Sequence, residues 1–270
     1  MTNSEDVDRV REGLMALSRQ LGDPNNDWAI LAEGNTSAAV DADEFLLKAS
    51  GSSLGRATPE SFVRVRFDAV FALLEQPPAS DEELAAALMG CLAEPGALRP
   101  SVEAALHGLA LTIGGARYVG HTHPTAVNGV LCSVNPTALT DGALFPDQIV
   151  VCGPHPLLVP YVDPGIPLAL EVRRRLLEHL DLYGAPPKAV YLQSHGLFAL
   201  GQTADEVLRV TAMAAKSARI LLGTFAAGGP RYLAASESQR IESREDEHYR
   251  RRVLARELGA NISPLTAPDH

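Results

Sequence analysis

Residues 117–124 have the sequence RYVGHTHP, and this stretch carries the most informative pattern in the chain. Arg117 to His123 is expected to form a strand, in which residues two apart point to the same face. His121 and His123 would then lie side by side as half of a metal site, because neutral imidazole is a good ligand for Zn²⁺. The alternative is an exposed strand that carries two unrelated histidines. The apolar residues around the pair favour a buried setting, in which each imidazole needs a partner.

Catalytic zinc usually takes three protein ligands and keeps one position open, so a third ligand must come from elsewhere. His195 is the best candidate, because it ends an apolar strand and precedes Gly196. A glycine there would allow the sharp turn that brings the ring inward. His155, in a Gly-Pro-His-Pro loop, is the alternative. The sequence therefore predicts a metal site of three histidines.

The composition is that of an ordinary globular protein with an acidic balance. The 270 residues include 23 Lys and Arg against 33 Asp and Glu, a formal net charge of −10. This balance argues against nucleic-acid binding, which needs a basic surface to neutralise phosphates. No window suits a membrane span, and the acidic N-terminus does not have the form of a secretory signal. Three cysteines without a C-x-x-C pair fit a reducing compartment, so we expect a cytoplasmic protein that does not act at membranes.

Periodic patterns predict helices and strands mixed within one α/β domain. Helices are expected over Val7–Leu21, from Ser80, from Ser101 to Gly114, from Pro167 to Gly184 and from Thr203 to Gly223. Strands are expected over Phe45–Leu47, Phe62–Arg66, Arg117–His123, Ile149–Val151, Leu157–Val159, Lys188–Gln193 and Leu197–Leu200. We assign residues 1–230 to this domain and the charged residues 231–270 to a C-terminal helix and tail.

Glu103 lies near the start of the helix that Ser101 opens, with His107 on the same helical face. One reading is purely structural, because the helix dipole favours a glutamate at a helix N-terminus. The other is a carboxylate beside the metal that serves as general acid and base. The spacing alone does not decide between these readings.

Two polar stretches that contain glycine can present backbone N–H groups and hydroxyls to an anion, although ordinary turns have the same composition. They are Gly34-Asn35-Thr36-Ser37 and Lys48 to Ser53. The nucleotide-binding patterns G-x-x-x-x-G-K-[ST] and G-x-G-x-x-G do not occur, so the sequence gives nucleotide binding no support.

The order of these motifs resembles the class II aldolase and adducin N-terminal family. The resemblance spans residues 5–225 and rests on Gly34-Asn35-Thr36-Ser37, Ser50-Gly51, Ser101-Val102-Glu103 with His107, His121-Thr122-His123-Pro124 and His195-Gly196. It implies a three-layer α/β/α fold with a central, mainly antiparallel sheet. It implies Zn²⁺ held by His121, His123 and His195, with Glu103 as the acid and base. It implies a substrate phosphate held by Asn35, Ser50, Gly51 and Ser101.

Enzymes of that family are usually homotetramers with sites between subunits, so the resemblance implies a homo-oligomer. A tyrosine from a neighbouring chain often donates a proton there, and the candidates are Tyr161, Tyr232 and Tyr249. Sugar-phosphate aldolases commonly have a second serine at the position of Val102. One hydroxyl for the phosphate is therefore missing, and the resemblance implies either a sugar or a sugar phosphate as the substrate.

The resemblance implies an aldehyde-lyase that cleaves a ketose or ketose phosphate by retro-aldol reaction through a zinc-stabilised enediolate. A sugar-phosphate 4-epimerase or a decarboxylase could use the same metal site, and Mn²⁺ or Co²⁺ would fit the same ligands. The alternative of another class is a non-catalytic, adducin-like interaction module. Adducin-type domains lack the metal histidines, all three of which are present here.

Overall fold

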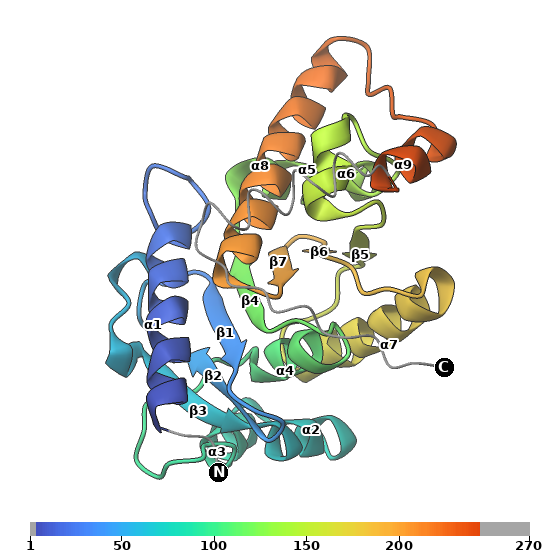
Figure 1. Ribbon diagram of the computed structural model, residues 1–270. Helices are drawn as coiled ribbons and strands as arrows, with labels where there is room; N and C mark the ends of the chain where they lie inside the picture. Colours follow the sequence, from blue (N-terminus) through green and yellow to red (C-terminus); the bar gives the residue numbers. More distant parts are fainter. Residues whose placement is uncertain (1–3, 244–270) are drawn as a thin grey trace, which may run out of the picture.

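The computed structural model describes residues 4–243, which form a seven-stranded sheet with helices on both faces (Figure 1). The strands are β1 (Asn35–Ala39), β2 (Glu44–Lys48), β3 (Phe62–Arg66), β4 (Tyr118–Thr122), β5 (Leu157–Val159), β6 (Ala189–Leu192) and β7 (Gly196–Gly201). Their order across the sheet is β3-β2-β1-β4-β7-β6-β5, and only the β5–β6 pair is parallel. The expected three-layer α/β/α fold with a mainly antiparallel sheet is confirmed.

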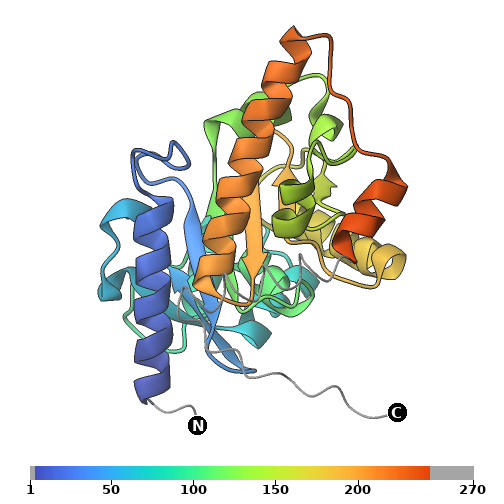
Figure 2. The ribbon, with the colours of Figure 1, turned by 45° about the horizontal axis from the view of Figure 1, so that its top comes forward.

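Each face of the sheet has its own helices and its own apolar core. One face is covered by α1 (Ser4–Leu21), α5 (Thr125–Leu131), α6 (Pro146–Cys152) and α8 (Ala204–Ala226). The other is covered by α2 (Phe67–Glu75), α3 (Asp81–Gly90), α4 (Ala104–Thr112) and α7 (Ile166–Tyr183). Figure 2 shows α1 and α8 side by side across the first face. Successive side chains of β2 point to opposite faces of the sheet, so this strand contributes to both cores. Leu46 packs into one core, and its neighbours Phe45 and Leu47 pack into the other.

The helix ends follow from local chemistry that the sequence predicts. Ser80 accepts a hydrogen bond from the backbone N–H of Glu83 at the start of α3, and Thr203 accepts one from Glu206 at the start of α8. α1 ends before Gly22, whose missing Cβ would lie 2.1 Å from the backbone nitrogen of Gly55. That close approach ties the end of α1 to a short 3-10 helix, Leu54–Arg56.

One predicted strand is wrong, because Ile149–Val151 lies within helix α6. A run of three apolar residues does not distinguish a strand from a buried helix segment, and Pro146 suits the first turn of a helix. The stretch from Asn35 onward is not a loop but strand β1. The helices α2 and α5 were not predicted. The other two 3-10 helices are Pro59–Ser61 and Pro136–Leu139.

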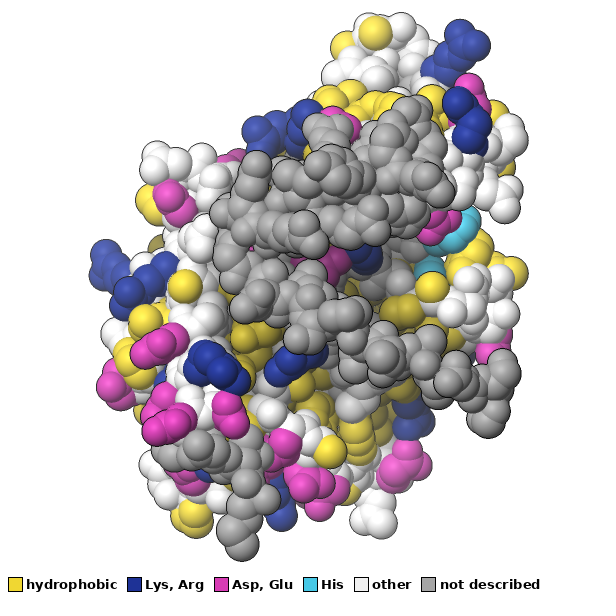
Figure 3. All heavy atoms as spheres, viewed as in Figure 1, with side chains coloured by type: hydrophobic (Ala, Val, Ile, Leu, Met, Phe, Trp, Pro, Cys, Tyr) yellow, Lys and Arg dark blue, Asp and Glu magenta, His cyan; other side chains and the backbone are white. Residues whose placement is uncertain are grey.

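The C-terminal part is described as far as residue 243. Helix α9 (Ala235–Glu242) packs its buried Ile241 against α6. Residues 231–234, where the charged helix was expected to begin, are not helical, and the part of that helix beyond residue 243 lies outside the described residues. The domain division at residue 230 thus stays a prediction. Within residues 4–243, no helix has the length and apolar character needed to cross a membrane. Figure 3 shows acidic and basic side chains interspersed over the described surface of one face.

Candidate metal centre

The three predicted histidines converge at one end of the central strands. His121 lies in β4, paired with Asn35 of β1 on one side and Phe198 of β7 on the other. His123 directly follows β4, and His195 lies in the turn between β6 and β7. Each ring offers one ligand nitrogen, and these nitrogens all lie within 4.8 Å of one another. The structure thus brings together residues that are 74 positions apart in the sequence.

Hydrogen bonding fixes which nitrogen of His121 can act as a ligand. Its Nδ1 lies 3.1 Å from the carbonyl oxygen of Leu197, which can only accept, so Nδ1–H donates. Burial lowers the pKa of His121 to about 3, so the ring is neutral near pH 7. The lone pair is therefore on Nε2, which lies 3.0 Å from Nε2 of His123. A metal-binding histidine commonly donates its other N–H to a backbone carbonyl in this way.

Glu103 reaches the same point from the start of α4. Its Oε1 lies 3.2 Å from Nε2 of His195 and 3.4 Å from Nε2 of His121. Burial alone raises the pKa of Glu103, but the two imidazoles and a hydrogen bond from Asn35 lower it well below its usual range. The carboxylate is therefore ionised near neutral pH.

The donor set fits a divalent cation. A carboxylate oxygen and three imidazole nitrogens face one another, and at least Nε2 of His121 and Oε1 of Glu103 carry lone pairs and no hydrogen. A cation among them would satisfy these acceptors together. Nitrogen and oxygen ligands of this kind suit Zn²⁺, Mn²⁺ or Co²⁺.

The family model for the class II aldolase and adducin N-terminal domain matches residues 12–222. The chain belongs to the class II aldolase and adducin N-terminal domain family. One curated relative, named uncharacterized oxidoreductase YuxG, of Bacillus subtilis (strain 168), is 26% identical over 188 residues. The match covers 66% of this chain but 24% of YuxG, so the chain spans about a quarter of that protein's length.

Two solved structures show the same fold. The N-terminal class II aldolase domain of a conserved protein from Thermoplasma acidophilum is 25% identical, with a TM-score of 0.61 over 78% of this chain and 92% of that one. The L-fuculose-1-phosphate aldolase from Thermus thermophilus is 21% identical, with a TM-score of 0.57 over 83% of this chain and 99% of that one. Members of this superfamily are mostly enzymes, and class II aldolases use a divalent metal.

Two of the four predicted phosphate-binding residues already bond within this class II aldolase domain. Nδ2 of Asn35 donates to Oε2 of Glu103 at 2.6 Å and to Oγ of Ser101 at 3.0 Å. Ser50 and Gly51 are exposed, and the backbone N–H of Ser50 donates to the carbonyl of Arg99. The four residues thus border one region, while their binding of a phosphate stays a prediction.

A buried histidine and a serine extend the site in a way that the sequence did not predict. Nδ1 of His107 lies 2.6 Å from Oγ of Ser37, and its Nε2 bonds to Oδ1 of Asn35. The sequence placed His107 on the helical face of Glu103, one turn further along. The spacing of four residues between Glu103 and His107 was the sequence feature that could have suggested a connection between these two side chains.

The turn that carries His195 differs in detail from the prediction. The positive φ of 56° falls on Ser194, not on Gly196. Gly196 is needed because of crowding: a Cβ there would lie 2.6 Å from Cδ2 of His123 and 2.6 Å from the carbonyl oxygen of Thr122. Nδ2 of Asn128 on α5 donates to the carbonyl of His195 at 3.0 Å and holds the turn in place.

The other candidates lie apart from the three-histidine group. The exposed His155 stacks on Tyr183, with ring centroids 3.9 Å apart. The hydroxyl of Tyr161 donates to Asp163, and that of Tyr232 donates to the carbonyl of Ala138. Tyr249 lies outside the described residues. The identity of a proton-donating tyrosine thus stays untested.

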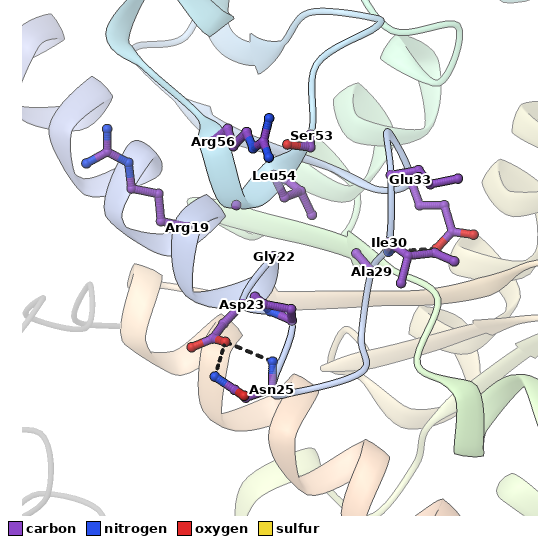
Figure 4. A pocket seen from close by; sticks show the side chains of 13 residues that line it. Arg19, Gly22, Asp23, Asn25, Ala29, Ile30, Glu33, Ser53, Leu54 and Arg56 are labelled. Atoms are coloured by element: carbon purple, nitrogen blue, oxygen red, sulfur yellow. Dashed lines mark hydrogen bonds between the residues drawn. The ribbon is translucent and has the colours of Figure 1, made fainter.

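A cavity of about 850 Å³, shown in Figure 4, has none of the three histidines in its lining. It is bordered by the end of α1, by the loop that follows and by the segment around Arg56. Glu33 lines it, with Oε1 3.9 Å from Nδ1 of His123. Nε2 of His123 faces His121, so Glu33 lies near the other nitrogen of the His123 ring.

Proposed function

We propose that this chain is a metal-dependent aldehyde-lyase that cleaves a ketose or ketose phosphate by a retro-aldol reaction. The observation that carries the proposal is the placement of Glu103, whose Oε1 lies within 3.4 Å of ligand nitrogens of His121 and His195. A carboxylate at that distance can exchange a proton with a substrate bound at the same point. A divalent ion held by the three histidines would polarise a substrate carbonyl and stabilise negative charge on its oxygen.

The protein's own part in the reaction follows from the two oxygens of Glu103. Oε2 is held by Asn35 at 2.6 Å, and Oε1 is directed toward the histidines. Oε1 is therefore the atom that takes and returns the proton. General acid–base catalysis by a positioned carboxylate contributes about 10²–10⁴-fold to a rate.

The polar groups beside Glu103 support a proposal for the substrate class. We assign Asn35, Ser50, Gly51 and Ser101 to the hydroxyls or the phosphate of a sugar. Val102 is 45% exposed at this edge and offers no hydroxyl there, so a free ketose belongs in the substrate panel beside the phosphorylated ones. We further propose Zn²⁺ as the resident ion and a cytoplasmic homotetramer as the working form.

The test is a screen of protein loaded with Zn²⁺, Mn²⁺ or Co²⁺ for aldehyde release from free and phosphorylated ketoses. Glu103→Gln should retain one metal per chain and lose turnover. Glu178→Gln is the matched control, because Glu178 is an exposed glutamate of α7 that pairs with Arg174 rather than with any of the three histidines, and it should remain active. Full activity of Glu103→Gln would refute the assignment. Release of CO₂ or formation of an epimer without aldehyde would assign the site to a decarboxylase or an epimerase, and failure to bind metal would favour an interaction module.

A further inference from the structure

A chain of four polar side chains crosses the contact between β1 and α4, on the side of Glu103 away from the metal histidines. Ser37 and Asn35 are two residues apart on β1 and share a face, while Glu103 and His107 lie one turn apart at the start of α4. Ser37 and His107 are completely buried, and Asn35 and Glu103 are at most 8% exposed. Groups so deeply buried depend on one another for their hydrogen bonds.

The direction of each hydrogen bond in this chain follows from Glu103. Nδ2 of Asn35 donates to Oε2 of Glu103 at 2.6 Å and to Oγ of Ser101 at 3.0 Å, so the amide nitrogen faces the carboxylate. The amide oxygen of Asn35 then faces His107 and accepts from its Nε2–H. Burial lowers the pKa of His107 to about 4, so the ring is neutral and its Nδ1 accepts from the Ser37 hydroxyl. Every donor therefore points toward Glu103.

A flip of the Asn35 amide would reverse the two contacts it makes. Its oxygen would then face Oε2 of Glu103, where two acceptors would stand 2.6 Å apart. Its NH₂ group would face Nε2–H of His107, where two donors would meet. The Nε2–H of His107 opposes that flip, because it needs the amide oxygen of Asn35 as its acceptor. An apolar side chain of similar size has no such proton and would not oppose the flip.

We propose that His107 is a positioning residue, which acts through Asn35 to hold Oε2 of Glu103 and so keeps Oε1 directed at the three histidines. The catalytic consequence rests on the function proposed above for Glu103. The hydrogen-bond directions do not depend on it. A side chain held by its own buried partners needs no reorganisation when substrate binds.

Neutron diffraction from crystals of the deuterated protein tests the directions without any substitution. Deuterium is expected on Nε2 and not on Nδ1 of His107, with the ND₂ group of Asn35 facing Glu103. Deuterium on Nδ1 of His107, or an Asn35 oxygen facing Glu103, would overturn the proposal.

Kinetics of His107→Leu and His107→Gln test the consequence. We expect His107→Leu to lower kcat about 10–100-fold, as loss of partners behind a reactive side chain commonly does, with KM and zinc content within about twofold of the parent. His107→Gln can still donate to Asn35 and should recover most of that loss. His179→Leu is the matched control, because His179 of α7 is only 5% exposed and donates to the carbonyl of His155, outside the hydrogen bonds that lead to Glu103.

The outcomes separate the proposal from its premise. Parental kcat in His107→Leu, or a loss of zinc that matches the loss of activity, would overturn the positioning role. An equal fall of kcat in His179→Leu would show that replacing any buried histidine by leucine lowers kcat. That result would also overturn the positioning role of His107. If His107→Leu does not fold, His107→Gln and the neutron result decide. Full activity in Glu103→Gln would instead remove the function proposed for Glu103 and leave the proton positions standing.

Discussion

A single added methyl group at Gly196 should weaken metal binding. The added Cβ of Gly196→Ala would lie 2.6 Å from Cδ2 of His123, 2.6 Å from the carbonyl oxygen of Thr122 and 3.2 Å from Cε1 of His121. Ordinary contact begins at 3.4 Å, so the nearest groups must move about 0.8 Å. The strand ladder opposes that movement, because Thr122 pairs with Leu197 in the register of β4 and β7.

The size of the effect follows from the precision that a metal site needs. Ligand distances in such sites hold to about ±0.2 Å, several times less than the displacement required. We expect at least about a tenfold loss of Zn²⁺ affinity, or about 1.4 kcal/mol. Overpacking should also lower the free energy of unfolding of the metal-free protein by about 1–3 kcal/mol.

Competition with a chromophoric chelator gives the Zn²⁺ affinity, and denaturant titration of the metal-free protein gives its stability. Gly223→Ala is the matched control, because no atom lies within 4 Å of its added Cβ on the exposed side of α8. That variant should bind Zn²⁺ like the parent and be equally or slightly more stable. Parental affinity in Gly196→Ala would refute the reasoning, since the histidines would then tolerate the crowding.

Three further predictions concern stability and reactivity. Burial lowers the pKa of His107 from 6.5 to about 4, so as the pH falls the histidine is protonated in the unfolded chain before it is protonated in the folded one. The free energy of unfolding of the metal-free protein should therefore fall by up to about 3 kcal/mol between pH 6.5 and pH 4. Denaturant titrations should show a weaker pH dependence for His107→Gln. Burial raises the pKa of the Cys91 thiol to about 11 and that of Cys152 to about 12, so a thiol reagent should label only the exposed Cys132, one per folded chain by mass spectrometry. Thr203→Ala should cost about 1 kcal/mol of unfolding free energy by removing the cap of α8, whereas Thr203→Ser should cost less.

Features that depend on near neighbours in the chain were predicted well. The apolar residues of α1 recur every three or four positions and are buried as expected, from Val7 to Leu21. The caps at Ser80 and Thr203 form as their spacing indicates. The pair His121 and His123 shares a face because a strand repeats every two residues.

Features that depend on contacts between distant segments were not predicted. No periodicity shows that β1 packs its Ser37 face against α4, so the bond from Ser37 to His107 could not be derived from spacing. The need for glycine at position 196 also depends on a distant segment. The sequence suggested backbone flexibility as the reason, whereas the structure shows that a side chain there would collide with His123, which follows another strand. In α6 the apolar run around Ile149 was compatible with a strand or a helix, and only its packing against α8 and α9 distinguishes them.

The site is therefore held by two arrangements of different kinds. The histidines take their positions from backbone pairing, since His121 is fixed by β1 on one side and β7 on the other and His195 by the turn that leads into β7. The carboxylate of Glu103 takes its position from side chains, through Asn35 and His107 at the contact of β1 with α4. β1 takes part in both arrangements, because Asn35 pairs with His121 through its backbone while its side chain holds Glu103. One residue thus connects the strand that carries His121 to the carboxylate of Glu103, and its amide can do so because it both donates and accepts.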